Sequence, residues 1–100
     1  MARRSNRPIR DELPELLRAR GMSQRQLAEA ARVDPGHLSR ALRKAEFKTF
    51  SGEVAARIAG TLGLPADYWP ETRDAATIAA IRSDPKLRDR IYDQLRRRRA

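Results

Sequence analysis

The sequence predicts an all-α protein, and three observations support this fold class. Apolar residues recur at intervals of three and four along most of the chain, which is the spacing of one face of an α-helix. Several of these stretches begin with a helix-start signal, either Ser with Gln three positions later or Asp followed by Pro. No stretch alternates apolar and polar residues in the manner of a β-strand. We therefore expect helices joined by short turns.

The first segments of the chain are a basic arm and a helix. Residues 1–8 carry three arginines and almost nothing apolar, so we expect a flexible or loosely held arm. A helix is predicted over about 11–20, with Asp11 able to cap its start and Gly21 placed to end it in a left-handed conformation. Pro14 then falls in the first turn, where its missing N–H is not needed.

The next two helices are the best-marked in the chain. Ser23 and Gln26 form a capping-box pattern that begins a helix over about 24–31. After a short turn, Asp34 and Pro35 supply an N-cap carboxylate and a first-turn proline, and they begin a third helix over about 35–44. The apolar side of this helix carries Leu38, Ala41, Leu42 and Ala45, and its other side carries Gly36, His37, Arg40, Arg43 and Lys44.

Three more helical segments follow. Ser51 caps a helix that runs to about Leu62, and the short stretch after Gly63 contains Tyr68 and Trp69, which we expect to be core anchors. Two further helices are predicted over about 72–82 and 85–96. The chain therefore divides into the arm at 1–8, a domain at 9–71 and a C-terminal helical extension at 72–100.

Composition limits the partners of the protein. One hundred residues are enough for one domain with a modest core. The chain has 22 Lys and Arg against 13 Asp and Glu, a formal net charge of +9, which favours a polyanionic partner and nucleic acid ahead of a membrane surface. There is no cysteine, and no apolar run approaches the roughly 20 residues of a membrane span. We expect a cytoplasmic protein that does not bind membranes.

Residues 24–34 and 37–40 resemble the lambda-repressor/Cro-like (XRE-type) family of helix-turn-helix proteins, and the similarity covers about 10–70. The resemblance implies a bundle of four to five helices and a bacterial or phage transcription regulator that binds double-stranded DNA as a dimer. It also implies that the helix over about 35–44 is the recognition helix and that Gln24 contacts phosphate. The family positions for base contact fall on Pro35, Gly36, His37 and Arg40.

The sequence departs from the family pattern at two places. Arg32 stands in the turn where the family usually has glycine, and a left-handed non-Gly residue costs on the order of 1 kcal/mol, so we expect a somewhat altered turn. The tip formed by residues 34–36 lacks the Ser, Thr or Gln that relatives often carry, so we expect few bases to be read there.

The contacts with DNA are predicted in two groups. Arg40 can donate two parallel hydrogen bonds to a guanine, worth about 1–3 kcal/mol of discrimination. The candidates for base contact are Gly36, His37, Ser39 and Arg40. The candidates for phosphate contact, which position the protein without reading sequence, are Gln24, Arg25, Arg43, Lys44 and Lys48.

The C-terminal extension carries more apolar residues than a monomeric tail needs. We predict a homodimer interface, and the alternative is packing on the core of the same chain. The arginine run at residues 96–99 is expected to be a disordered tail that adds nonspecific affinity. The predicted interface residues are Ile78, Ile81, Leu87, Ile91, Tyr92 and Leu95.

The resulting hypothesis is a sequence-specific transcriptional regulator, most simply a repressor that binds a palindromic operator. Two alternatives stay open: an antitoxin-type protein whose C-terminal helices hold a partner protein, and a weakly specific architectural DNA-binding protein. With one His, no Cys and no glycine-rich phosphate loop, we expect no enzymatic activity, no metal site and no cofactor.

Overall fold

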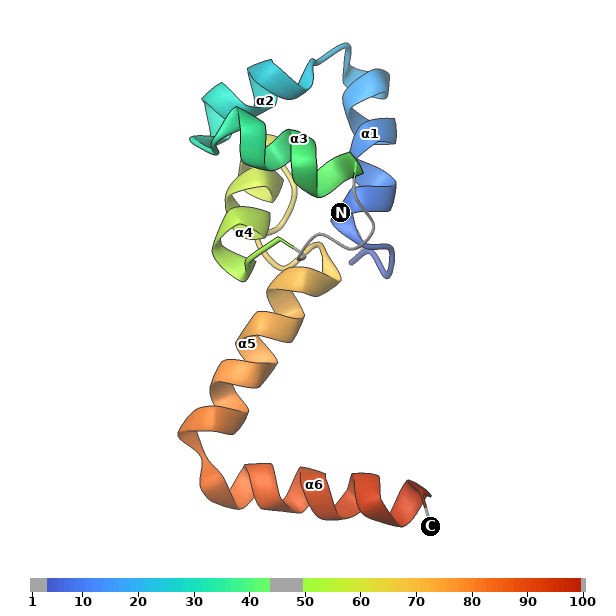
Figure 1. Cartoon of the computed structure of the whole chain (residues 1–100), viewed down its shortest axis with the longest axis vertical. Helices are drawn as coiled ribbons and strands as arrows, with labels where there is room; N and C mark the ends of the chain where they lie inside the picture. Colours follow the sequence, from blue (N-terminus) through green and yellow to red (C-terminus); the bar gives the residue numbers. More distant parts are fainter. Residues whose placement is uncertain (1–3, 44–49, 100) are drawn as a thin grey trace.

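A computed structural model describes residues 4–43 and 50–99, which form α-helices and no strand (Figure 1). The all-α fold predicted from the sequence is confirmed for these residues. None of the helices in the described ranges is long and apolar enough to span a bilayer. The helices are α1 (Ile9–Arg20), α2 (Gln24–Ala31), α3 (Pro35–Arg43), α4 (Gly52–Thr61), α5 (Pro70–Ser83) and α6 (Pro85–Arg99).

The helix ends follow local capping chemistry. The Ser23 hydroxyl accepts a hydrogen bond from the Gln26 backbone N–H at 3.0 Å, and the Gln26 side chain accepts one from the Ser23 N–H at 2.8 Å. This reciprocal pair confirms the capping box that begins α2. Gly21 ends α1 in the left-handed conformation, as predicted, with φ of 62°. Ser51 caps α4 by accepting from the Val54 N–H at 3.2 Å.

The start of α1 differs from the prediction. The helix begins at Ile9, because the Pro8 carbonyl accepts hydrogen bonds from the N–H groups of Asp11 and Glu12, at 3.1 and 3.2 Å. A Glu71 carboxylate oxygen accepts from the Ile9 N–H at 3.1 Å and so binds one of the first donors of the helix. Asp11 therefore does not cap α1, and Pro14 lies inside it rather than in the first turn.

The core lies between α1, α2, α3, α4 and the start of α5. Its largest fully buried side chains are Trp69, Ile9, Leu13, Leu27, Leu38 and Ile58. Trp69 packs edge-on against Tyr68, with ring centroids 5.2 Å apart, which confirms both as anchors of the core. Burial raises the pKa of the Tyr68 phenol, and the neighbouring Glu12 carboxylate raises it further.

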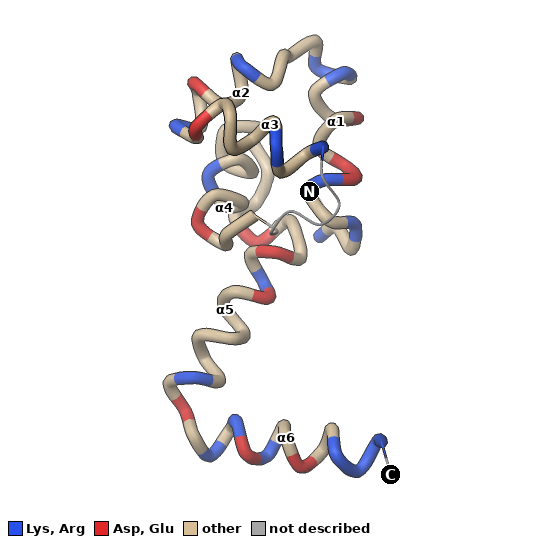
Figure 2. The backbone as a smooth tube through the Cα atoms, viewed as in Figure 1, with Lys and Arg blue, Asp and Glu red and all other residues tan. Residues whose placement is uncertain are grey.

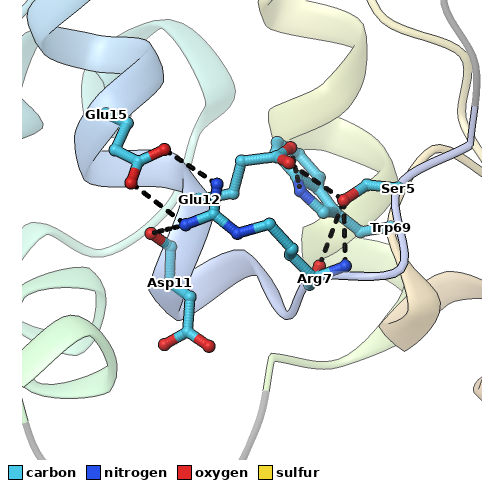
Figure 3. Close-up of polar contacts among 6 residues, drawn as sticks. All are labelled: Ser5, Arg7, Asp11, Glu12, Glu15 and Trp69. Carbon is cyan, nitrogen blue, oxygen red and sulfur yellow. Dashed lines mark hydrogen bonds and ion pairs between the residues drawn. The ribbon is translucent and has the colours of Figure 1, made fainter.

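The N-terminal residues 4–8 are not loosely held. Ser5 is buried; its N–H donates to the Tyr68 carbonyl at 2.7 Å and its hydroxyl donates to Glu12 at 2.9 Å. The other Glu12 oxygen accepts from the Trp69 indole N–H at 3.0 Å (Figure 3). The expectation of a flexible arm is therefore wrong for residues 4–8, because these hydrogen bonds join them to the core. Residues 1–3 lie outside the described ranges.

A salt bridge adds to this attachment. Arg7 pairs with Glu15 on α1, with Nη1 and Oε2 2.8 Å apart (Figure 3). The hydrogen bond from Arg7, together with its charge, lowers the pKa of the Glu15 carboxyl. Both side chains are about half exposed, so the pair contributes little to stability.

The C-terminal helices project from the bundle. The start of α5 packs against α4 where Gly52 faces Ala75, and a Cβ added at Gly52 would lie 2.6 Å from the Ala75 Cβ. Beyond this contact α5 runs away from the bundle and turns at Asp84 into α6 (Figure 1). Neither α5 nor α6 contains a buried residue in the described range. We call residues 76–99 the C-terminal arm; with it the molecule extends 48 Å along its longest axis.

Candidate nucleic-acid interface

The turn between α2 and α3 fixes how the two helices meet. Arg32 has φ of 57° and ψ of 47°, so it adopts the left-handed conformation that glycine reaches at lower cost, and the altered turn expected from the missing glycine takes this form. The next N–H, from Val33, donates to the Ala28 carbonyl at 2.9 Å, and the Val33 side chain is buried. The backbone thus turns sharply without glycine, and the departure from the family pattern appears as strain at Arg32.

The first turn of α3 is held by Asp34. One oxygen of its carboxylate accepts a hydrogen bond from the His37 backbone N–H at 2.7 Å, and Pro35 follows as the first helical residue. This confirms the predicted cap-plus-proline start. Leu38 and Ala41 are buried against the bundle, so the rotation of α3 about its axis is set by these two side chains.

The exposed face of α3 follows from that rotation. Gly36, Arg40 and Arg43 lie at helical spacings of three and four residues, and all three are exposed. His37 and Ser39 flank this line and are partly buried. The structure therefore groups Gly36 with the two arginines at the centre of the face and places the other two base-contact candidates at its edges.

Gly36 and Arg40 are neighbours on this face. A Cβ added at Gly36 would lie 3.3 Å from the Arg40 Nη1 atom and 3.3 Å from a carboxylate oxygen of Asp34. The Arg40 guanidinium therefore extends back along α3 to its first turn, over the space that glycine leaves. The N-terminal part of a recognition helix is the part that meets base edges in the major groove. Arg40 thus places its N–H donors at the N-terminal end of α3, where Pro35 and Gly36 have no side-chain donor.

The predicted phosphate contacts lie around this face. Gln24 and Arg25 are exposed in the first turn of α2, and Arg43 is exposed at the end of α3. Figure 2 shows basic segments on both helices. Lys44 and Lys48 lie outside the described residues.

Two arginines that the sequence did not single out join distant segments of the fold. Arg20 donates to the Leu62 carbonyl, and Arg73 donates to the carbonyls of Ser5, Asp67 and Tyr68. Arg20 and Leu62 are 42 residues apart, and Arg73 and Ser5 are 68 apart, so no local pattern could have indicated these contacts. These contacts join α1 to the end of α4 and α5 to the N-terminal residues, on the part of the bundle that supports α2 and α3.

Three of the six predicted dimer residues are the exposed large apolar side chains of the described ranges. Ile78, Tyr92 and Leu95 are 49%, 59% and 49% exposed, while Ile81, Leu87 and Ile91 are partly buried. None of them packs into the core of the bundle. Within residues 4–43 and 50–99, no group of three or more acidic or His side chains is placed to hold a metal ion.

Comparison with known proteins agrees with this geometry. A family model described as helix-turn-helix matches residues 15–69, which include α2, the turn, α3 and α4. No curated protein and no solved structure matches the chain.

Proposed function

Because this chain belongs to the lambda-repressor-like helix-turn-helix family of DNA-binding regulatory proteins, we propose that it is a transcriptional repressor that binds a palindromic operator as a homodimer. The observation that carries the proposal is the exposed face of α3, where Arg40 reaches the first turn of the helix over Gly36. In this role α3 enters the major groove and the protein acts by covering a promoter.

Arg40 is the main base-reading residue of the proposal. Its guanidinium can donate two parallel hydrogen bonds to the O6 and N7 atoms of guanine. Gly36 lets the helix approach the groove closely, and His37 and Ser39 at the edges of the face can reach neighbouring bases. The proposed half-site is therefore short and contains guanine.

Phosphate contacts supply most of the affinity in this account. Gln24 and Arg25 at the start of α2 and Arg43 at the end of α3 flank the reading face, and Lys44 and Lys48 follow in the chain. Each phosphate that a cation neutralises lowers the slope of log affinity against log salt by about 0.9. A steep salt dependence supports the proposal, and a flat one contradicts it.

The apolar residues of the C-terminal arm support the dimer. Ile78, Tyr92 and Leu95 remain in contact with water in one chain, although covering apolar surface is worth about 25 cal/mol per Å². A second copy that covers them would bring two α3 helices onto one duplex, about 34 Å apart for successive turns of DNA.

The test of the proposed function is selection from a pool of random duplexes. We expect an enriched inverted repeat whose half-sites contain guanine. A pool with no enriched motif would contradict sequence-specific regulation and favour the architectural alternative.

The C-terminal arm could bind a different protein instead of a second copy of the chain, because either partner would cover the same exposed apolar side chains. Light scattering on the full chain at high concentration, with and without DNA, decides between them. A dimer supports the proposal; a monomer under both conditions contradicts it and favours an antitoxin-type role, in which the arm holds another protein.

A further inference from the structure

The end of α6 is the most basic segment that the structure describes. Helix α6 carries Lys86, Arg88, Arg90 and the four consecutive arginines 96–99, against only Asp89 and Asp93. The run at 96–99 is helical to Arg99, so the expectation of a disordered tail is wrong; arginine is a good helix former, and cations are favoured at a helix C-terminus. We call residues 96–99 the arginine tip.

The arginine tip keeps its charge as far as the described residues go. The Arg96 guanidinium carbon lies over the Tyr92 ring, 5.9 Å from its centre, in a cation–π contact that does not cancel the charge of the arginine. In the described ranges no carboxylate forms an ion pair with any of the four arginines. Successive residues on a helix are about 100° apart, so the four side chains surround the axis. Such a collar suits an extended anionic surface.

The arginine tip lies far from the reading face. In Figure 1, α2 and α3 are at one end of the long axis and α6 is at the other, with α5 between them. Figure 2 shows the basic end of α6 separated from the basic segments of the bundle by this length of helix. The molecule extends 48 Å along this axis, and the α2–α3 pair and α6 lie toward its opposite ends. The tip is therefore placed to contact something other than the half-site under α3.

We propose that the arginine tip is a second DNA-contacting surface, which binds phosphate groups outside the half-site that α3 reads. Guanidinium groups suit this partner because each can donate two parallel hydrogen bonds to a phosphate, and the collar has no single face that could read bases. The phosphates belong either to flanking DNA of the same duplex or to a second duplex. The inference rests on the proposed function, to which it adds a second surface.

The experiment compares the full chain with a variant in which residues 96–99 are all changed from Arg to Gln. A matched control removes the same charge from exposed arginines elsewhere: Arg18→Gln, Arg57→Gln, Arg82→Gln and Arg90→Gln. Circular dichroism checks that both variants keep their helices. The probes are duplexes of random sequence, one of about 10 base pairs, which is shorter than the molecule, and one of about 45, so the result does not depend on an operator being found.

Two results support the proposal, one for each source of phosphate. With flanking DNA, the tip variant loses about tenfold or more in affinity for the long duplex and little for the short one, and its salt slope falls by about 0.9 per lost contact. With a second duplex, the wild type captures a labelled short duplex on beads that carry another, and the tip variant does not. The control variant keeps both behaviours.

Other results overturn the proposal. Equal losses on both duplex lengths in both variants would show that only net charge matters. An unchanged tip variant, or a wild type with neither behaviour, would remove the second surface. If the tip is needed for binding vesicles of phosphatidylglycerol while neither DNA measurement responds, the partner is an anionic membrane surface instead.

Discussion

At the scale of single residues, the start of α3 has no side-chain donor on Pro35 or Gly36, and the Arg40 side chain, which begins one turn later, brings its donors there. Gly36 leaves the space, and the Arg40 guanidinium occupies it, with Nη1 3.3 Å from the position that a Gly36 Cβ would take. The sequence could predict that Gly36 and Arg40 share a face, since they are one turn apart. It could not predict the direction of the Arg40 side chain, which depends on its rotamers.

Replacing Arg40 with alanine tests this arrangement. Arg40→Ala is expected to weaken binding to the selected operator by about 1–3 kcal/mol, or about 5- to 150-fold, because a bidentate contact to guanine is lost. Binding to random duplexes should fall much less. The control is Arg18→Ala, an exposed arginine on α1. Equal losses on operator and random DNA would show that Arg40 contacts only phosphate.

Arg32 provides a second prediction at this scale. Its left-handed backbone costs on the order of 1 kcal/mol, so Arg32→Gly is expected to stabilise the fold and raise the melting temperature by several degrees. Arg32→Ala keeps the strain and removes the side chain, so it serves as the control. A glycine variant that melts no higher than the alanine variant would mean that the turn is not strained.

At the scale of elements, the sequence predicts best where a helix is set by its own neighbours. The capping residues at 23 and 51 and the Asp34 carboxylate each act within three positions, and α2, α3 and α4 begin where they indicate. The partner of the first helical N–H of α1 could not be predicted in this way, because the Ile9 N–H donates to Glu71, which is 62 residues away. The end of α6 differs from the prediction because a run of arginines resembles a charged tail, although arginine favours helices.

The contact between α4 and α5 can be tested with two glycines. A Cβ at Gly52 would lie 2.6 Å from the Ala75 Cβ, so Gly52→Ala is expected to destabilise the fold by about 1–3 kcal/mol through overpacking. At Gly60 an added Cβ meets nothing within 4 Å, so Gly60→Ala should stabilise α4 by about 0.5–1 kcal/mol. Urea unfolding measures both.

Rescue by a second change makes the prediction sharper. Ala75→Gly in the Gly52→Ala background should recover most of the lost stability, because it removes the Cβ atom that the new methyl group would meet. If Gly52→Ala and Gly60→Ala are equally stable, α5 does not pack on α4 in the way described.

At the scale of the whole molecule, a small bundle carries an arm that has no buried residue in its described part. The sequence indicated that residues 72–100 hold surplus apolar side chains, but helical spacing does not say whether such a stripe meets its own core or another molecule. The structure places Ile78, Tyr92 and Leu95 away from the core. The candidate reading face, by contrast, could be predicted from residues 23–43 alone, because its helices are set by local signals.

The proposed dimer gives a prediction for the arm. Ile78→Asn combined with Leu95→Asn is expected to raise the dimer dissociation constant by about tenfold or more. The reason is that two apolar side chains, whose burial would stabilise the dimer, are replaced by polar ones. Both positions are about half exposed in one chain, so helix content should stay unchanged. Thr77→Asn is the control. Sedimentation that finds the same dissociation constant for all three proteins would place the interface elsewhere.

The central claim is that α3 is the element that meets DNA, and an NMR titration tests it most directly. Amide signals of the full chain, assigned beforehand, are followed while a short duplex carrying the selected half-site is added. We expect the largest shifts at residues 36–43 and at Gln24 and Arg25, with the buried face of α1 unaffected. Shifts concentrated on α4 or α5, with α3 unchanged at saturation, would contradict the account.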